Sequence, residues 1–569
     1  MQYPNKAARL VLLVLLCAAV FAVVGGVAAQ SSTPKVLVSG RQMGPDDVTT
    51  LDPSLMQDVN SVQIASEMFP GLTNLDEEKV TLGPGIATSW DTSADGSTFT
   101  LHLMDNVPWV KYNSATGQVE EVKDDSGNVR MVTAQDFAFA IQRTLDPITA
   151  GPYQGVFQNW IKGGAEFVAS DPKASDAVRA PLIAALGIKV VDDHTLQLTA
   201  PLASSVTPLI FSMWGLWAEP KWVIDASADL WTDPANIESY GPYALMQWTH
   251  GGGGNLTLVK NPFWTGTPNS PVAKIDQIQF VFLDSDPQLA NFEAGTLDVS
   301  EVPQDAIDRI HADKTLSADY FKGPGSCTYY YGYGTLKAPF DDASVRLAFS
   351  EAVDRQSIVE NVTKGGQLPA SYFSLPNLVA APTEAAYPGQ GVYTNIDDAK
   401  ALWQAYLTKT GHQASDFSPT LVYNNSASHA AIAQAIQQMW QQTFGVTVQL
   451  TSEDFSTFLD NRTTFDVYRA GWCFDYPDAN NFLHDDLAST TGQNWHNAAF
   501  DKLVQDGLTA STLQQRTDDY AQAEHILVKT DAAYIPIYDY ITQDLTQPYV
   551  TRTHSLITRE VYEKWDISK

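Results

Sequence analysis

The chain has 569 residues, of which 44% are hydrophobic and 11% aromatic, so it is long enough for two or three domains and has an ordinary globular composition. Its formal charge of −31 repels nucleic acid and anionic membranes, so neither is expected as a partner. The charge says little about a ligand held inside a closed cleft.

Residues 1–29 are predicted to direct export. An apolar run over 10–29 follows Lys6 and Arg9, and Val27–Ala29 supplies the small residues of a cleavage site before Gln30. An uncleaved membrane anchor is the alternative, because an apolar run of this length can span a bilayer. No second apolar run approaches that length, so the mature chain, about 540 residues (569 − 29), is expected to be soluble.

The cysteines fit an exported protein. Cys17 lies inside the apolar run and lacks the small preceding residue of a lipid-attachment site, so a lipoprotein is not predicted. Only Cys327 and Cys473 remain after cleavage. Two cysteines in an exported chain suggest one disulfide, and two buried free thiols are the alternative.

Strand and helix patterns alternate along the chain. Strands are predicted over 97–103, 193–201, 255–260 and 446–450. Helices are predicted over 132–147, starting at Thr133, over 341–366, capped by Asp341 or Asp342 and stopped by Gly365 or Gly366, and over 428–445, ending at Gly445. Helices between strands favour α/β layers.

Catalytic motifs are not found, so no enzyme, metal or cofactor is predicted. The chain lacks HExxH and GxSxG, and its ten histidines show no ligand spacing. The run Gly251–Gly254 is not followed by the residues of a phosphate loop and is expected to be a hairpin tip. LDSDPQ at 283–288 lacks the acidic ladder of a calcium loop. Asp475 and Asp478 form only a very weak acid/base pattern.

The stretch RAGWCFDYPD, residues 469–478, places aromatic side chains around Asp475. A carboxylate in apolar surroundings needs a partner, because burying an unpaired charge is costly. Asp475 is therefore expected to bind a ligand, to cap a turn or to pair with a protein cation.

Ordered blocks along the chain resemble the extracellular solute-binding proteins of the oligopeptide and dipeptide class, bacterial family 5, which serve ATP-driven (ABC) importers. The blocks are TLDP at 50–53, MFPGL at 68–72, PGIATSWDTSADGSTFTLHLMDNVPW at 84–109, VTAQDFAFAIQRTLDP at 132–147, GPYALMQW at 241–248, KNPFW at 260–264 and PFDDASVRLAFSEAVDR at 339–355. The family more often has Glu where Pro70 stands. Each block is weak alone, and the ordered set is specific.

The resemblance implies a two-lobed α/β fold of the periplasmic-binding-protein type (cluster C), with an extra α/β domain inserted in the N-terminal lobe. Carried onto this chain, the signal peptide is 1–29, lobe I is 30–70 with 200–325 and 545–569, the extra domain is 71–199, and lobe II is 326–544. The lobes of such proteins close on the ligand by hinge motion.

Two stretches resemble the oligopeptide branch of the family, CTYYYGYGTLKAPF at 327–340 and RAGWCFDYPD at 469–478. The resemblance implies a Cys327–Cys473 disulfide and implies that Asp475 receives the ammonium of the peptide's N-terminus. Trp472 and Tyr476 are expected to form an apolar wall around it. The resemblance implies that Gly471 and Cys473 of this stretch also contact the ligand.

At the other end of the peptide, Arg469 and His429 match family positions that approach the ligand carboxylate. Capping of a helix is the alternative role for His429. The family's lysine falls on Thr363, with Lys364 beside it, and this departure leaves the preferred peptide length open.

The implied function is capture of short oligopeptides and delivery to membrane permease subunits, by a monomer in the periplasm or on the outer face of the cell membrane. One alternative keeps the fold and binds another solute: a dipeptide, an oligosaccharide, a nickel chelate or haem. A more distant alternative is a secreted hydrolase, which the missing nucleophile and metal motifs disfavour.

Overall fold

The computed structural model describes residues 34–40, 47–486, 495–557 and 559–569. The predicted export signal, including Cys17, lies outside the described residues. From Lys35 to Lys569 the chain forms one compact unit. Within the part of the chain that is described, no helix is both long and apolar enough to cross a membrane.

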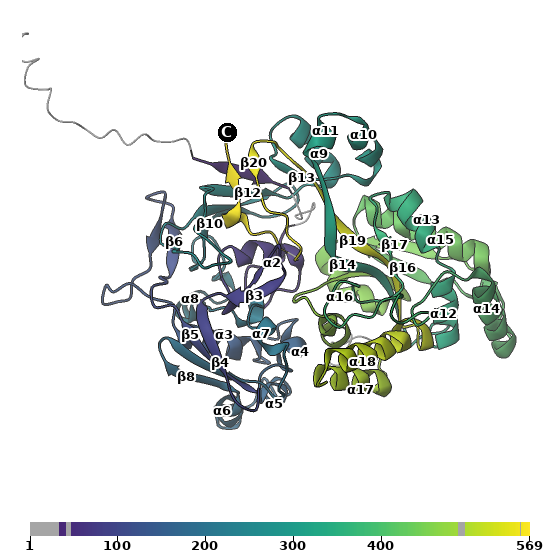
Figure 1. Ribbon diagram of the computed structural model, residues 1–569, viewed down its shortest axis with the longest axis horizontal. Helices are drawn as coiled ribbons and strands as arrows, with labels where there is room; N and C mark the ends of the chain where they lie inside the picture. Colours follow the sequence, from purple (N-terminus) through teal and green to yellow (C-terminus); the bar gives the residue numbers. More distant parts are fainter. Residues whose placement is uncertain (1–33, 41–46, 487–494, 558) are drawn as a thin grey trace, which may run out of the picture. The chain divides into compact units, whose positions relative to one another are not determined.

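A mixed sheet of eleven strands runs through this unit (Figure 1). Its strands, in spatial order, are β10 Tyr243–Thr249, β11 Asn255–Lys260, β12 Gln277–Val281, β1 Val36–Ser39, β13 Val299–Glu301, β19 Tyr534–Thr546, β14 Tyr320–Tyr333, β18 Val467–Cys473, β16 Thr420–Asn424 and β17 Gln449–Glu453, with β15 Leu368–Pro369 paired to β19. Strand β1 near the start of the described chain and strand β19 near its end thus belong to the same sheet.

The long strands β14 and β19 lie side by side in the centre of Figure 1 and connect the two halves of the sheet. The end of β19 pairs with β13, where Glu301 lies opposite Asp544. The other end of β14 pairs with β18 from Cys327 to Tyr333. Strand β13 in one half of the sheet and strand β18 in the other are therefore held together by the pair β14 and β19.

A smaller antiparallel sheet belongs to the first half of the chain. Its strands are β4 Ala87–Thr92, β5 Thr98–Leu103, β9 Thr195–Thr199 and β8 Ile188–Asp192. Helix α3, Ala134–Thr144, shares a hydrophobic core with this sheet through Phe137 and Ile141. Three two-stranded pairs complete the strands: β2 Thr73–Asp76 with β3 Thr81–Pro84, β6 Val110–Asn113 with β7 Gln118–Glu121, and β20 Val550–Thr551 with β21 Asp566–Ile567.

The longer helices of the second half pack around its strands. They are α12 Ala343–Glu351, α14 Ile396–Thr410, α15 Ala427–Phe444, α17 Ala498–Leu508 and α18 Leu513–His525. The remaining α-helices are α2 Val59–Ser66, α4 Gln154–Phe157, α5 Gly164–Val168, α6 Asp176–Ala185, α7 Thr207–Ile210, α8 Lys221–Ser227, α9 Ser285–Glu293, α10 Ile307–Ala312, α11 Leu316–Asp319, α13 Arg355–Ser357 and α16 Phe455–Asn461.

The hydrophobic cores follow the same division. One large core draws almost all its residues from 37–299 and 550–567. Two further cores draw mainly on 329–540, one on each side of the strands β14 and β18. Apolar burial is the main stabilising term in folding, so each half has its own source of stability.

Buried charges join distant sequence blocks of the first half. Arg143 pairs with Asp52 at 2.6 Å and with Glu219 at 3.0 Å. Trp231 also donates to Asp52, at 2.8 Å. Buried charges are tolerated when they are paired in this way. Two of the blocks named above, TLDP and VTAQDFAFAIQRTLDP, thus meet in one network.

Most predicted elements are present. The strands at β5, β9 and β11, the helix α3 with its capping box at Thr133, and the hairpin tip between β10 and β11 are confirmed. Helix α15 ends at Gly445, which is left-handed. The strand predicted at 446–450 begins only at Gln449.

The single helix predicted over 341–366 is wrong. Helix α12 begins after its cap Asp342 and ends at Glu351, and a second helical segment starts after Asp354, whose side chain accepts from Ser357 N. That segment stops at Lys364, in the left-handed conformation, before the predicted glycines. The break positions Arg355, whose buried guanidinium donates to backbone carbonyls.

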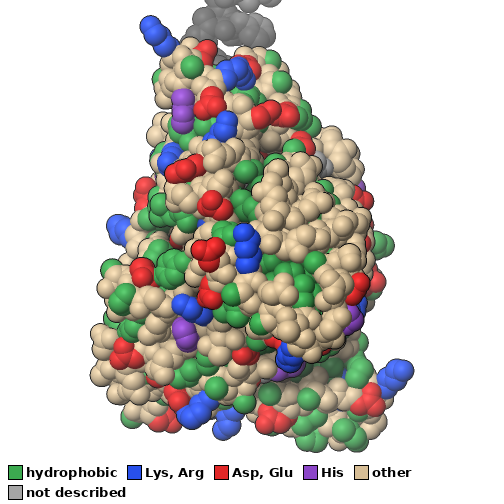
Figure 2. Space-filling model, turned by 90° about the vertical axis from the view of Figure 1, so that its right-hand side faces the viewer, with side chains coloured by type: hydrophobic (Ala, Val, Ile, Leu, Met, Phe, Trp, Pro, Cys, Tyr) green, Lys and Arg blue, Asp and Glu red, His purple; other side chains and the backbone are tan. Residues whose placement is uncertain are grey.

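Acidic and basic side chains are interspersed over the face that Figure 2 shows, and they do not gather into one patch. This face therefore carries no continuous basic stripe of the kind that binds nucleic acid.

Candidate functional site

The candidate site is built on the end of strand β18. Cys473, its last residue, lies directly opposite Cys327 on β14, and the two form a disulfide with their Cα atoms 3.9 Å apart. The predicted pairing is confirmed. The bond fixes the point at which the chain leaves the sheet and enters the loop that carries Asp475.

Asn481 holds the side chains of this loop. Its Oδ1 accepts from Trp472 Nε1 at 2.9 Å and from the Asp475 backbone N–H at 3.1 Å. Its Nδ2 donates to Asp475 Oδ2 at 3.1 Å and to Asp485 Oδ2 at 3.2 Å. Asn481 is fully buried, whereas Asp475 keeps partial exposure. The amide thus orients the Asp475 carboxylate and contributes no charge of its own.

The other acidic residue of the loop has a structural partner. Asp478 is buried and pairs with Arg516 at 2.6 Å. Burial raises the pKa of Asp478 to about 6, and Arg516 opposes that rise. Tyr476 is also fully buried, and its hydroxyl donates to Asp485 at 2.7 Å. Through these contacts Asp478 and Tyr476 anchor the loop to the protein interior.

Arg469 lies on the same strand, in tyrosine-rich surroundings. Its guanidinium donates to Asn424 Oδ1 at 3.0 Å and to the Tyr540 hydroxyl at 2.5 Å, and it stacks 4.7 Å above the Tyr329 ring. Among the residues that the structure describes, its Nε has no hydrogen-bond partner and no carboxylate lies within ion-pairing distance. Arg469 is 9% exposed, so it is a nearly buried cation without a protein counter-ion among the described residues.

His429 stands beside this cation. Its Nδ1 lies 3.4 Å from the hydroxyl of Tyr329, the residue whose ring faces the Arg469 guanidinium. Burial, and then the charge of Arg469, lower the pKa of His429 well below its usual value, so the imidazole is neutral at pH 7. Helix α15 is capped at Ser426, not at His429.

Lys364 is placed differently from the other predicted residues. Its Nζ pairs with Asp308 Oδ2 of helix α10 at 3.3 Å, and its side chain is 44% exposed. Thr363 beside it is buried and donates to Gln367. The structure therefore brings Asp475, Trp472 and Cys473 together, places Arg469 with His429, and connects Lys364 to α10.

Aromatic side chains from the segment 153–160 cover the end of β18. The Tyr153 ring stacks on Trp472 with 6.3 Å between centroids and 10° between planes. Trp160 meets Tyr476 edge-on at 6.4 Å and His484 at 5.8 Å. The wall beside Asp475 is thus completed by residues that are more than 300 positions away in sequence (472 − 153).

Several site residues had not been predicted. The alternation of tyrosines in the stretch 327–333 could have placed Tyr329 and Tyr331 on one face of a strand, and Tyr538 with Tyr540 repeats the pattern. Asn424 and Asn481 carried no comparable signal, because a single asparagine in a loop or at a strand end is common.

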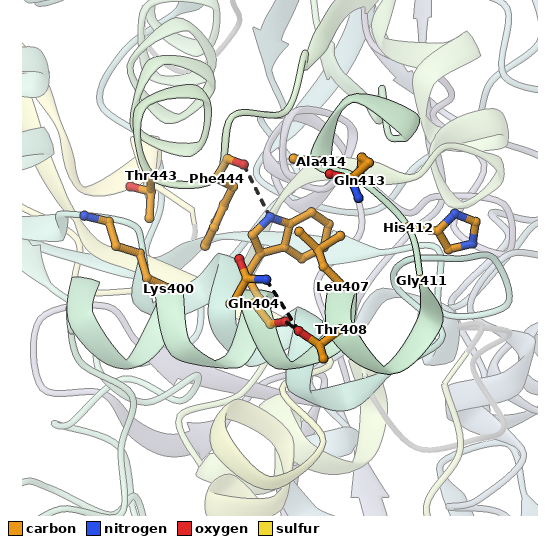
Figure 3. A pocket seen from close by; sticks show the side chains of 11 residues that line it. Lys400, Gln404, Leu407, Thr408, Gly411, His412, Gln413, Ala414, Thr443 and Phe444 are labelled. Carbon is orange, nitrogen blue, oxygen red and sulfur yellow. Dashed lines mark hydrogen bonds between the residues drawn. The ribbon is translucent and has the colours of Figure 1, made fainter.

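Two hollows of the surface lie away from these residues or at their border. A cavity of about 680 Å³ opens where helix α14 ends near the last turn of α15 (Figure 3). Trp403, His412 and Phe444 contribute to its lining, and none of the predicted site residues does. A second hollow of about 470 Å³ combines residues of the extra-domain range with His484 and Leu508. Among the described residues, no group of three or more His, Cys, Asp or Glu side chains could hold a metal.

The chain is similar to known binding proteins over almost its whole length. It is 31% identical to the periplasmic oligopeptide-binding protein OppA of Salmonella typhimurium, with 89% of this chain and 87% of the relative covered. It is 30% identical to the periplasmic murein peptide-binding protein MppA of Escherichia coli, with 89% of this chain and 88% of the relative covered.

Two solved structures of a murein tripeptide-binding protein MppA, one of them from Escherichia coli, allow a comparison of conformation, both at 26% identity. One covers 95% of this chain and 99% of its own with a TM-score of 0.80. The unliganded open form covers 94% and 98% with a TM-score of 0.62. The present structure therefore has the same two-lobed α/β fold and differs more from the open form.

The family model of the bacterial extracellular solute-binding proteins, family 5 (middle part), matches residues 81–494. This range covers well over half of the chain and includes the disulfide and Asp475. The chain therefore belongs to the family 5 extracellular solute-binding proteins.

Proposed function

We propose that the protein is the substrate-binding component of an ABC importer, which captures short oligopeptides between two lobes and delivers them to a membrane permease. The lobes are those expected from the sequence: lobe I is 30–70 with 200–325 and 545–569, the extra domain is 71–199, and lobe II is 326–544. The separate hydrophobic cores support this division. The protein acts outside the cytoplasm, as a monomer and without catalysis.

The observation that carries this proposal is the placement of two charges, Arg469 on strand β18 and Asp475 in the loop that follows it. Arg469 and Asp475 are six residues apart (475 − 469), which is about 20 Å in a fully extended chain and less where the loop turns after Cys473. A short extended peptide has opposite charges at a similar spacing. Its ammonium is matched by Asp475, and its carboxylate by Arg469 with the neutral His429.

The strand itself explains how many sequences can be accepted. Gly471 is exposed, lacks a side chain, and lies beside Trp472 and Cys473 at the end of β18. A peptide laid along this strand offers the same backbone groups whatever its sequence. Charge-assisted hydrogen bonds at its termini then fix the register, at roughly 1.5–3 kcal/mol each.

The conformation is consistent with a closed cleft. The Tyr153–Trp472 and Trp160–Tyr476 contacts join the extra-domain range to lobe II. A ligand favours closure only to the extent that it binds both sides better in the closed state. Tyr153 and Trp472 are the residues that would lose contact on opening.

Native mass spectrometry of the purified mature protein, followed by calorimetry with tri-, tetra- and pentaalanine, tests the proposal. We expect the native mass spectrum to show peptides that stay bound to the protein, and calorimetry to show binding of at least one of the three oligoalanines. Retention of a sugar, bile acid or metal chelate, with no binding of any free peptide, would overturn it. Release of cleaved peptide products would instead identify a hydrolase.

A further inference from the structure

Trp160, in the turn after helix α4, packs against two rings of the segment that follows β18. It meets the Tyr476 ring edge-on with 6.4 Å between centroids, and the His484 ring at 5.8 Å. The indole is 3% exposed, and its Nε1 has no hydrogen-bond partner in the described chain, so the ring is held by packing. Tyr476 belongs to the same hydrophobic core as Trp160. The extra-domain range therefore covers this part of lobe II.

The same two rings hold Asp485, whose side chain is fully buried. The Tyr476 hydroxyl donates to Asp485 Oδ2 at 2.7 Å, and His484 Nδ1 lies 2.8 Å from Oδ1. Because a carboxylate only accepts hydrogen bonds, Nδ1 is the donor in this contact. Burial, and then the charge of Asp485, raise the pKa of the Tyr476 hydroxyl well above its usual value, so this hydroxyl remains a donor. Within the described chain, His484 is the only ion-pair partner of Asp485.

Asp485 also acts on the orientation of the Asn481 amide. Asn481 Nδ2 donates to Asp485 Oδ2 at 3.2 Å and to Asp475 Oδ2 at 3.1 Å, so both carboxylates lie on its NH₂ side. Its Oδ1 faces two donors, Trp472 Nε1 and the Asp475 backbone N–H. An amide that is turned over would place its oxygen against two carboxylates and its NH₂ group against two N–H donors. The buried charge of Asp485 therefore reinforces the orientation in which Asn481 holds Asp475 and Trp472.

We infer that Trp160 is a positioning residue, which couples closure of the two lobes to the geometry of the pocket for the peptide's N-terminus. The inference rests on the proposed peptide-binding function and specifies how that pocket is set. When the lobes close, the indole shields Asp485 and its two ring donors from water, and hydrogen bonds are stronger where water is excluded. Asn481 then holds the Asp475 carboxylate in place for the ammonium. Opening removes the indole, and water competes for the same donors.

Calorimetry tests this coupling with one oligoalanine, the one that binds the wild-type protein most tightly, in its free and N-acetylated forms. The ratio of the two dissociation constants measures how strongly the pocket selects the ammonium. A variant that is merely less stable lowers the active fraction, which the stoichiometry reports, and leaves this ratio unchanged. Trp160→Leu should weaken binding of the free peptide by about tenfold and lower the ratio by about threefold or more. Trp160→Phe keeps an aromatic ring and should restore most of both.

Asp485→Asn tests the same coupling without touching the indole. It keeps the shape of the side chain and removes the charge that orients Asn481, so it should also lower the ratio by about threefold or more. Trp248→Leu is the matched control, because Trp248 likewise packs on a histidine, His250, with 4.2 Å between ring centroids. It lies on β10, at the edge of the sheet farthest from the β16–β18 strands, and its variant should keep the wild-type ratio.

If either Trp160→Leu or Asp485→Asn keeps the wild-type ratio, the coupling is overturned and peptide binding stands. The same conclusion follows if Trp248→Leu lowers the ratio as much as Trp160→Leu does, or if the wild-type protein binds the free and acetylated peptides equally well. If no peptide binds the wild-type protein, the proposed function fails, and this inference fails with it.

Discussion

The side chain of Asn481 bridges Trp472 and Asp475: it accepts a hydrogen bond from Trp472 Nε1 at 2.9 Å and donates one to Asp475 Oδ2 at 3.1 Å. One buried amide therefore fixes the aromatic wall and the carboxylate that it surrounds. In the proposed function this arrangement sets the geometry of the N-terminus pocket before the ligand arrives, which reduces the ordering cost of binding.

We expect Asn481→Ala to weaken binding of trialanine by about 5- to 150-fold, because Trp472 Nε1 and the Asp475 N–H lose their acceptor, at a cost of roughly 1–3 kcal/mol. Calorimetry measures the affinity, and urea unfolding shows how much of the effect is on stability. Asn361→Ala, at an exposed position, is the control. An unchanged affinity in Asn481→Ala would show that Asp475 is oriented by other contacts.

Arg469 should be required for peptides with a free carboxylate. Its guanidinium is almost buried and lacks a described counter-ion, so Arg469→Gln should weaken trialanine binding by roughly 2–5 kcal/mol. Amidation of the peptide's C-terminus should weaken binding to the wild-type protein, and have little further effect in the variant. Arg309→Gln, which alters an exposed ion pair with Glu293, is the control. Equal affinity for free and amidated peptides would remove Arg469 from the site.

The Cys327–Cys473 disulfide closes a loop with a sequence separation of 146 residues, for which the loop-entropy model gives about 5 kcal/mol of stabilisation as an upper bound. Ellman titration of the denatured, unreduced mature chain should find no free thiol. Replacement of both cysteines by serine should lower the free energy of unfolding, measured in urea, by a few kcal/mol. Two titratable thiols in the mature chain would contradict the assignment.

Glu77 gives a pH dependence of stability. Burial raises its pKa from 4.5 to about 7, although Lys564 opposes the rise. Because the folded-state pKa is the higher one, this group stabilises the fold below about pH 4.5 and loses that contribution as the pH rises through 7. Burial also raises the pKa of Glu219 to about 7 and the pKa of Glu524 to about 6, so both carboxyls change the stability in the same direction.

Glu77→Gln should therefore gain stability relative to the wild-type protein between pH 4.5 and pH 8, by up to about 3 kcal/mol for a pKa difference of 2.5 (7 − 4.5). Urea unfolding at both pH values measures the change. Glu78→Gln, at the exposed neighbouring position, should show almost none. A Glu77→Gln effect that does not vary with pH would mean that this carboxyl titrates normally.

The sequence pattern predicted the secondary structure correctly where the structure depends only on neighbouring residues. The Thr133 capping box and the alternation at Phe99, Leu101 and Leu103 were predictable because caps and period-two burial are local properties. The break after Glu351 was not, because it depends on Arg355 reaching Pro536 on a strand 181 positions later. Helical spacing continues across the break, so the pattern alone favours one helix.

The site was predictable only in part for the same reason. Its residues on one strand were found through the resemblance of a continuous stretch to a known family. Tyr540, Asn424 and Tyr153 come from separate segments that only the fold brings to Arg469 and Trp472.

The Asp475 carboxylate provides the most direct test of the N-terminus pocket. Asp475→Asn keeps the shape of the side chain and removes its charge, so the peptide ammonium is desolvated without a counter-ion. We expect a loss of roughly 2–5 kcal/mol, or about 30- to several-thousand-fold in affinity. Acetylation of the peptide's N-terminus should cause a similar loss in the wild-type protein. The two changes should be far from additive, because both remove the same interaction. Calorimetry on the four combinations measures the coupling, and an acetylated peptide that binds the wild-type protein as tightly as the free peptide would make Asp475 a structural residue.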